Sequence, residues 1–149
     1  MTSFVKRLLG SGFYTGYIPY APGTFGSLAS LLFFLIPGFI NFYIILPITV
    51  IAFLIGIPLG TYFETVYRKY PKQFTLDEFV GTWITFLFIP QNLIQFIIAF
   101  IVWRVLDIVK PFPANKSESL KGGFGIMMDD VVSGLYSLVI MIIFNFIFF

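Results

Sequence analysis

Two stretches of this chain decide its fold class: residues 42–63 read FYIILPITVIAFLIGIPLGTYF, and residues 131–149 read VVSGLYSLVIMIIFNFIFF. Neither stretch contains a charged side chain. A helix needs about 20 predominantly apolar residues to cross the hydrocarbon core of a bilayer, and both stretches have about that length. We therefore expect two membrane-spanning helices, the first of them bent at Pro47 and Pro58.

The rest of the chain is nearly as poor in charge. Of 149 residues, 58% are hydrophobic and 11% are charged, whereas a soluble domain usually has about a quarter charged residues. No charged residue lies between Arg7 and Glu64, between Glu78 and Arg104, or after Asp130. This distribution predicts an all-α protein, a small multi-helix integral membrane bundle with short or kinked helices and a polar site at its cytoplasmic face.

Proline, glycine and polar residues divide the apolar sequence into segments. Besides the two spans, we expect shorter helices over residues 24–36, 79–89 and 93–102, and a polar loop over residues 104–130. The sequence contains no internal repeat, so residues 1–149 are expected to form a single membrane-embedded domain.

The basic residues form three clusters, and the positive-inside rule places all three on the cytoplasmic side. The clusters are Lys6 and Arg7; Arg68, Lys69 and Lys72; and Arg104, Lys110, Lys116 and Lys121. Residues 79–103 must then enter and leave on the same side, so we expect a helical hairpin that turns at Pro90-Gln91-Asn92. The chain is thus expected to be a multi-pass protein of the cytoplasmic membrane.

Composition also removes classes of function. The net charge of +2 is too small for a nucleic-acid-binding surface. The absence of Cys and His excludes zinc sites of the usual kind, Cys nucleophiles, and His bases or nucleophiles. Catalysis would have to rest on Asp, Glu, Lys, Arg, Ser, Thr and Tyr, with a hard metal ion bound by carboxylates.

Two polar clusters stand at the starts of apolar segments. Residues 21–27 read APGTFGS, and glycines and hydroxyls before a helix favour an anion such as phosphate. A plain helix cap by Thr24 is the alternative. Asp77 and Glu78 precede an apolar helix, where acids complement the helix dipole. Because neighbouring side chains point about 100° apart on a helix, one of the two acids can still face the bundle.

A third polar cluster lies near the start of the last helix. Asp129 and Asp130 sit between apolar residues, either as an exposed N-cap or as a pair that needs a cation. All charged candidates can gather on one face of the bundle: Asp77, Glu78, Asp107, Asp129 and Asp130, with Arg104 and Lys110. Oxygen ligands of this kind suit Mg²⁺, Mn²⁺ or Ca²⁺, so the residues indicate metal-dependent phosphate chemistry at the membrane surface.

Four blocks of sequence resemble the phosphatidylglycerophosphatase A family and occur in its order. They are PGTFGSL (22–28), DEFVG (77–81), RVLDIVKPFP (104–113) and GGFGIMMDD (122–130). The resemblance implies an all-helical bacterial inner-membrane enzyme that depends on Mg²⁺. Its implied reaction is the hydrolysis of the phospholipid phosphatidylglycerophosphate to phosphatidylglycerol and phosphate.

Carried onto this sequence, the resemblance implies roles for the polar residues. The implied metal ligands are Asp77, Glu78, Asp129 and Asp130. The implied catalytic groups are Asp107, Asp129, Asp130 and Lys110, and the implied phosphate-binding groups are Thr24, Ser27, Arg104 and Lys110.

Several points of mechanism stay open at this level. Phosphohistidine and phosphocysteine routes are excluded and no Asp-x-Asp motif is present, so we expect in-line attack of water on phosphorus with help from Mg²⁺. Asp107 is either a ligand or the general base. The alternatives are a phosphatase for another lipid phosphate and a non-enzymatic protein that binds divalent cations. Glu118 is expected to lie in a solvated loop without a role, and the oligomeric state cannot be derived.

Overall fold

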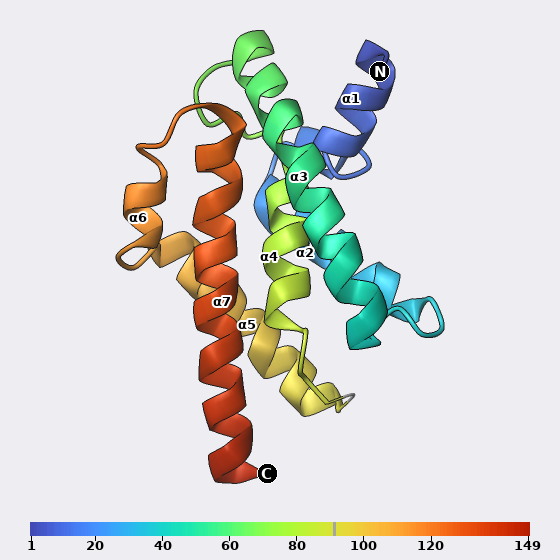
Figure 1. Ribbon diagram of the computed structural model, residues 1–149, viewed down its shortest axis with the longest axis vertical. Coiled ribbons are helices and arrows are strands. Elements are labelled where there is room, and N and C mark those ends of the chain that lie inside the picture. Colours follow the sequence, from blue (N-terminus) through green and yellow to red (C-terminus); the bar gives the residue numbers. More distant parts are fainter. Residues whose placement is uncertain (91) are drawn as a thin grey trace.

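The computed structural model describes residues 1–90 and 92–149, and these residues form helices and connecting loops without any strand (Figure 1). The elements are α1 (Ser3–Gly10), the 3₁₀ turn η1 (Thr15–Tyr17), α2 (Pro22–Leu31), the 3₁₀ turn η2 (Leu32–Leu35), α3 (Phe42–Val66), α4 (Leu76–Thr85), α5 (Leu93–Val109), α6 (Ala114–Ser117) and α7 (Gly122–Phe148). The expected all-α class is confirmed.

The two predicted spans are present as α3 and α7. These helices have 25 and 27 residues, and the most apolar parts of them have mean hydropathies of 2.5 and 2.3. Both are long and apolar enough to cross a membrane. α3 continues as one helix through Pro47 and Pro58, so neither proline ends it.

The predicted loop over residues 104–130 is wrong at both ends. α5 runs on to Val109 instead of ending at 102, and α7 begins at Gly122 instead of near 131. The short α6 lies between them. The first apolar segment agrees better, since α2 and η2 together cover residues 22–35.

These boundary errors concern the charged residues directly. Arg104 and Asp107 lie on α5, and Asp129 and Asp130 lie well inside α7 rather than at its N-cap. A charge usually signals a loop because it needs water, but here the charges face neighbouring helices, and most of them find ionic partners there. The N-cap alternative for the two aspartates is therefore excluded.

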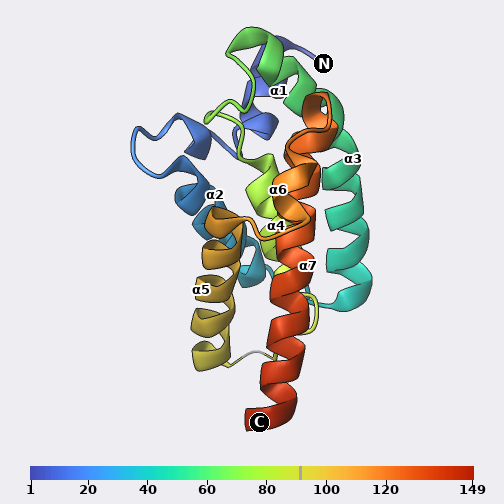
Figure 2. The same cartoon turned by 90° about the vertical axis from the view of Figure 1, so that its left-hand side faces the viewer.

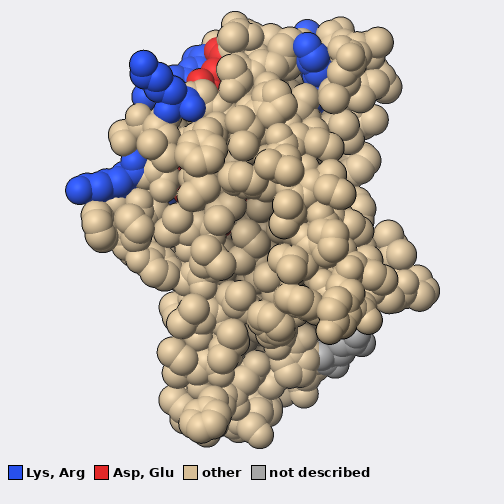
Figure 3. Space-filling model, viewed as in Figure 1, with Lys and Arg blue, Asp and Glu red and all other residues tan. Residues whose placement is uncertain are grey.

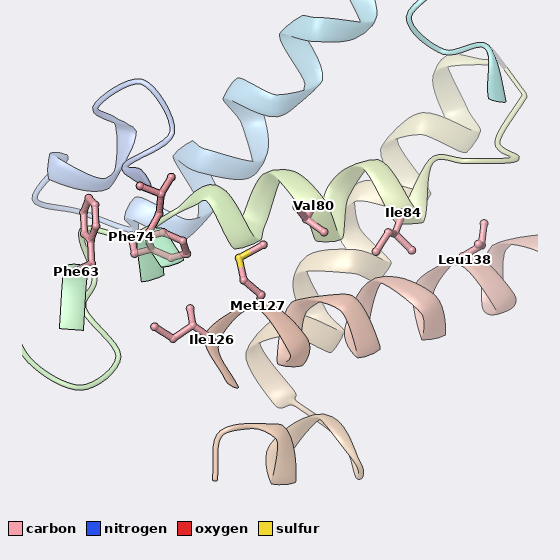
Figure 4. Close-up of a cluster of buried hydrophobic side chains, with 8 residues drawn as sticks. Phe63, Phe74, Val80, Ile84, Ile126, Met127 and Leu138 are labelled. Atoms are coloured by element: carbon pink, nitrogen blue, oxygen red, sulfur yellow. The ribbon is translucent and has the colours of Figure 1, made fainter. Parts of the chain in front are cut away.

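α4 is the central element of the bundle. Every residue from Phe79 to Thr85 is buried, because α2, α3, α5 and α7 all pack against this helix. Figure 4 shows part of this core, with Val80 and Ile84 of α4 beside Met127 and Leu138 of α7. A ten-residue helix is only about 15 Å long, half the thickness of a bilayer core.

Glycines allow α7 to pack closely against two helices. A Cβ atom at Gly134 would lie 2.7 Å from the carbonyl oxygen of Gly81 on α4, and one at Gly60 of α3 would lie 2.8 Å from the Cα of Gly123. Both distances are shorter than van der Waals contact. The small residues thus set the spacing of the backbones that carry the acidic side chains.

α4 and α5 form the predicted hairpin. Glu78 in the first turn of α4 lies 2.7 Å from Arg104 near the end of α5, so the chain returns to the end at which it entered. α5 then runs beside α7 in the opposite direction (Figures 1 and 2). Of the predicted turn Pro90-Gln91-Asn92, Gln91 lies outside the described residues.

The two ends of the molecule differ in charge. On the face drawn in Figure 3, Lys, Arg, Asp and Glu gather over the upper part, and no residue of these four types is visible over the described lower part. Large aliphatic side chains remain exposed around the outside of the bundle, such as Leu54 of α3, Ile101 of α5 and Val139 of α7. A continuous apolar surface of this kind fits contact with lipid rather than water.

Candidate active site

All five predicted acidic residues line one cavity at the charged end, with a volume of about 650 Å³. They are Asp77 and Glu78 of α4, Asp107 of α5, and Asp129 and Asp130 of α7. Lys110, just after α5, lines the same cavity. The loops before α2 and before α4 complete its wall, so residues far apart in the sequence meet here.

The first turn of α4 supplies two acids, as predicted. The side chain of Asp77 accepts a hydrogen bond of 3.0 Å from the backbone N–H of Glu78. Burial and the charge of Asp107 raise the pKa of Glu78 and Arg104 lowers it, and the net result is a pKa of about 8. Burial and the neighbouring carboxylates also raise the pKa of Asp77. Both groups therefore need positive charge nearby in order to ionise.

Arg104 is not among the described residues that line the cavity, so its predicted contact with phosphate stays a prediction, but it forms ion pairs with two of the lining acids. One of its terminal nitrogens donates to Glu78 at 2.7 Å, to Asp107 at 2.8 Å and to the hydroxyl of Ser27 at 3.1 Å. The indole of Trp103 also donates to Ser27, at 3.2 Å. Ser27 itself donates to Glu78 at 3.3 Å, so α2, α4 and α5 are joined in one network.

Neither of the two hydroxyl residues predicted to bind phosphate is among the described residues that line the cavity. Ser27 is fully buried and contacts Arg104 rather than the cavity, and Thr24 is half-buried and is not among the described residues of the cavity lining. Their roles toward phosphate stay predictions. Gly23 does line the cavity, and a Cβ atom there would lie 2.3 Å from Oε1 of Glu78. This close approach was not predicted, although the glycine in the PGT block is a signal for it.

Lys110 connects the cavity to α6. It caps α5 in the left-handed backbone conformation with φ of 49°. Its ammonium group forms ion pairs with Asp129 and, at 2.7 Å, with Glu118. Burial lowers the pKa of Lys110, but these two carboxylates outweigh that effect and raise it above the ordinary value. Glu118 lies in the turn after α6 with 42% of its side chain exposed, as expected for a solvated loop, but its ion pair with Lys110 was not predicted.

The acids of α7 are the most deeply buried. Asp129 and Asp130 are each 2% exposed. Within the described part of the chain, one oxygen of each, Oδ1 of Asp129 and Oδ2 of Asp130, has no hydrogen-bond partner. Buried carboxylate oxygens without partners are costly, and a hard divalent cation is the partner that suits them. The donor set of the cavity therefore fits a metal ion.

The fold and the cavity define a class: a helical membrane protein with a carboxylate-rich site, suited to a metal ion, at one end of its bundle. Comparison with known sequences narrows this class. The profile of the family Phosphatidylglycerophosphatase A matches residues 8–145 of this chain. The chain belongs to the phosphatidylglycerophosphatase A family and is a phosphoric monoester hydrolase.

Three relatives align along most of their length. A protein of Bacteroides thetaiotaomicron named putative phosphatidylinositol-3-phosphatase is 39% identical over 93% of this chain and 92% of its own. The phosphatidylglycerophosphatase A of Haemophilus influenzae is 38% identical over 90% and 85%, and that of Escherichia coli is 34% identical over 88% and 78%. No solved structure matches this chain at a significant level.

Proposed function

We propose that this chain is a Mg²⁺-dependent phosphatase that hydrolyses phosphatidylglycerophosphate to phosphatidylglycerol and inorganic phosphate at the cytoplasmic face of the bacterial inner membrane. The main supporting observation is that five carboxylates and Lys110 line one cavity, and that Arg104 forms ion pairs with two of these carboxylates, Glu78 and Asp107. Two relatives that align with most of the chain are named phosphatidylglycerophosphatase A, which supports this substrate.

Mg²⁺ is the proposed ion because every candidate ligand is a carboxylate oxygen and the substrate adds phosphate oxygens. The proposed ligands are Asp77, Glu78, Asp129 and Asp130. When bound, the ion supplies Lewis-acid polarisation of the phosphate group and offsets its charge.

The side chains of the cavity account for the rest of the proposed reaction. The oxygen of a water molecule bonds to phosphorus, the ester bond between phosphorus and the glycerol oxygen breaks, and that oxygen leaves as the alcohol after it takes up the proton that the water released. Asp107 is the proposed acceptor of the proton of the water. Lys110 and Arg104 offset the charge on the phosphate oxygens. Ser27 acts through Arg104, which it holds in place.

A second substrate of the same reaction type is favoured by one comparison. The Bacteroides relative carries the name of a phosphatidylinositol-3-phosphatase and is 39% identical to this chain. A phosphoinositide monoester would present the same phosphate group on a larger polar head. The choice between the two substrates is a matter of measurement.

The test is phosphate release by the purified protein in detergent from phosphatidylglycerophosphate, phosphatidylinositol 3-phosphate and phosphatidate. We expect the fastest release from phosphatidylglycerophosphate, none in excess EDTA, and recovery when Mg²⁺ is restored. Faster release from the phosphoinositide would make that lipid the preferred substrate. Undiminished release of phosphate in EDTA would exclude the proposed dependence on a metal ion. Absence of release from every lipid would favour a non-enzymatic cation-binding protein.

A further inference from the structure

We propose that the five carboxylates of the cavity hold two divalent cations side by side, with Asp130 as the ligand that both ions share. The inference deepens the proposed function, since it specifies the metal content of the same site. The number of ions can be counted without turnover, however, so it is tested separately from the substrate.

The positions of the carboxylate oxygens divide the acids into two groups of three. In each group, one oxygen from every residue lies within 4.8 Å of the others. The first group is Asp77, Asp129 and Asp130, and the second is Glu78, Asp107 and Asp130. Asp130 alone belongs to both, and its two oxygens allow it to serve one ion with each.

Helix geometry explains why the acids separate in this way. Asp77 and Glu78 are consecutive on α4, and Asp129 and Asp130 are consecutive on α7. Consecutive side chains on a helix point about 100° apart, so Asp77 and Glu78 belong to different groups, whereas Asp129 and Asp130 share the first group and Asp130 alone also reaches the second. Each helix thus offers carboxylates to two neighbouring positions, and phosphatases with two metals hold them about 3.5–4 Å apart.

Buried carboxylate oxygens without hydrogen-bond partners favour cation binding, and this observation is independent of the grouping. Oδ1 of Asp129 and Oδ2 of Asp130 have no hydrogen-bond partner within the described part of the chain, and both residues are 2% exposed and line the cavity. Neither Asp77 nor Asp130 forms an ion pair with any described residue, because Arg104 and Lys110 are engaged elsewhere. The first group therefore has less compensating positive charge than the second, and a bound cation would stabilise it more.

The formal charge of the cavity favours more than one divalent ion. Counting Glu118, which pairs with Lys110, there are six carboxylates, and the basic side chains are Lys72, Arg104 and Lys110, which leaves a formal charge of −3 when all groups are ionised. One divalent ion would leave −1, and the phosphomonoester then brings further negative charge into a buried site. Two divalent ions would give the protein groups a small positive charge before the anionic substrate enters.

The experiment counts Mn²⁺ bound to the purified full chain in detergent, from the EPR signal of free Mn²⁺ at equilibrium. Wild-type protein is expected to bind two ions, with the low-temperature spectrum of a spin-coupled pair. Asp77→Asn and Asp107→Asn each remove a ligand from one group only, so each variant is expected to keep one ion and lose the coupling. Asp130→Asn is expected to lower the affinity for both ions by at least tenfold.

The matched control is Glu64→Gln. Glu64 neither lines the cavity nor belongs to either group of acids, so this variant should keep two coupled ions. Circular dichroism and gel filtration of every variant identify loss of fold, and wild-type stoichiometry decides the proposal even if one variant fails. A single ion in wild type, or two ions without coupling, would overturn the shared site. Mg²⁺-dependent phosphate release from the same samples separates the outcomes: turnover with one bound ion leaves the proposed function intact, and two coupled ions without turnover leave the metal site intact.

Discussion

At the scale of single residues, Lys110 is constrained in both its backbone and its side chain. Its backbone adopts the left-handed conformation that ends α5, and its ammonium group lies between Asp129 inside the cavity and Glu118 at its edge. A free lysine side chain samples many rotamers, so the pair with Glu118 restricts Lys110 to the direction of the site. Glu118 is in this sense a positioning residue.

Glu118→Gln should lower activity modestly. The ion pair with Lys110 is partly exposed, with 42% of the Glu118 side chain accessible, and such pairs contribute up to about 1 kcal/mol. We therefore expect kcat to fall by no more than about fivefold, with little change in thermal stability. Steady-state kinetics with the lipid substrate measure this, and Glu118→Asp should recover part of the loss. A loss as large as that of an aspartate of α7 would place Glu118 in direct contact with the substrate.

Asp129→Asn and Asp130→Asn should each lower kcat by about 10² or more, which is typical for removal of one key electrostatic group from an active site. The reason is that both carboxylates are buried with an oxygen lacking any described partner, and an amide cannot replace them as metal ligands. Glu64→Gln is the control, because Glu64 lies outside the cavity. Near wild-type turnover in both aspartate variants would show that these acids are structural.

At the scale of elements, the crossing of α4 and α7 connects packing to chemistry. Gly81 and Gly134 bring these two backbones together, and the acids of both helices lie toward the charged end from this crossing. A change in helix spacing would therefore alter the distances between the carboxylates. Stability and activity should respond together at this crossing.

Gly134→Ala tests this connection. The added methyl group would lie 2.7 Å from the carbonyl of Gly81, so the helices must separate, and overpacking of this kind costs about 1–3 kcal/mol. We expect a lower unfolding temperature in detergent and a lower kcat. Ser133→Ala is the neighbouring control: its buried hydroxyl oxygen lacks a partner among the described residues, so its removal should leave stability unchanged. Unchanged stability of Gly134→Ala would mean that the crossing tolerates expansion.

At the scale of the whole molecule, the separation of charged and apolar ends predicts the orientation in the membrane. The hairpin of α4 and α5 returns to the charged end, whereas α3 and α7 each connect the two ends. The loops before α4 and after α5 should therefore lie on the same side of the membrane. The start of α3, at Tyr43, should lie on the other side.

The chain lacks cysteine, so single cysteines can report this arrangement. In spheroplasts treated with a membrane-impermeant thiol reagent, Lys69→Cys and Ser119→Cys should stay protected until the membrane is permeabilised. Tyr43→Cys, at a site 84% exposed, should react at once. Different labelling of Lys69→Cys and Ser119→Cys would mean that residues 79–103 cross the membrane fully.

Much of this architecture follows from sequence because uncharged length determines a membrane helix. The absence of charge predicted the spans α3 and α7 and the hairpin. The gathering of the five acids followed from their positions at segment ends that this arrangement brings to one side. The boundaries near Arg104 and Asp129 were not predictable, because a charge on a helix is satisfied by partners that only the tertiary fold supplies. The pairing of Glu118 with Lys110 and the contact of Gly23 with Glu78 were missed for the same reason.

The cavity lies at the charged end of a bundle whose outer surface is largely aliphatic, and this arrangement has a consequence for the departure of products. For the proposed substrate, hydrolysis divides a molecule into a part that dissolves in water and a part that dissolves in lipid. Phosphate diffuses away in three dimensions, and the lipid, which keeps the single negative charge of its phosphodiester, diffuses sideways within the bilayer. The two products therefore leave the site into different phases, phosphate into the water and the lipid into the bilayer.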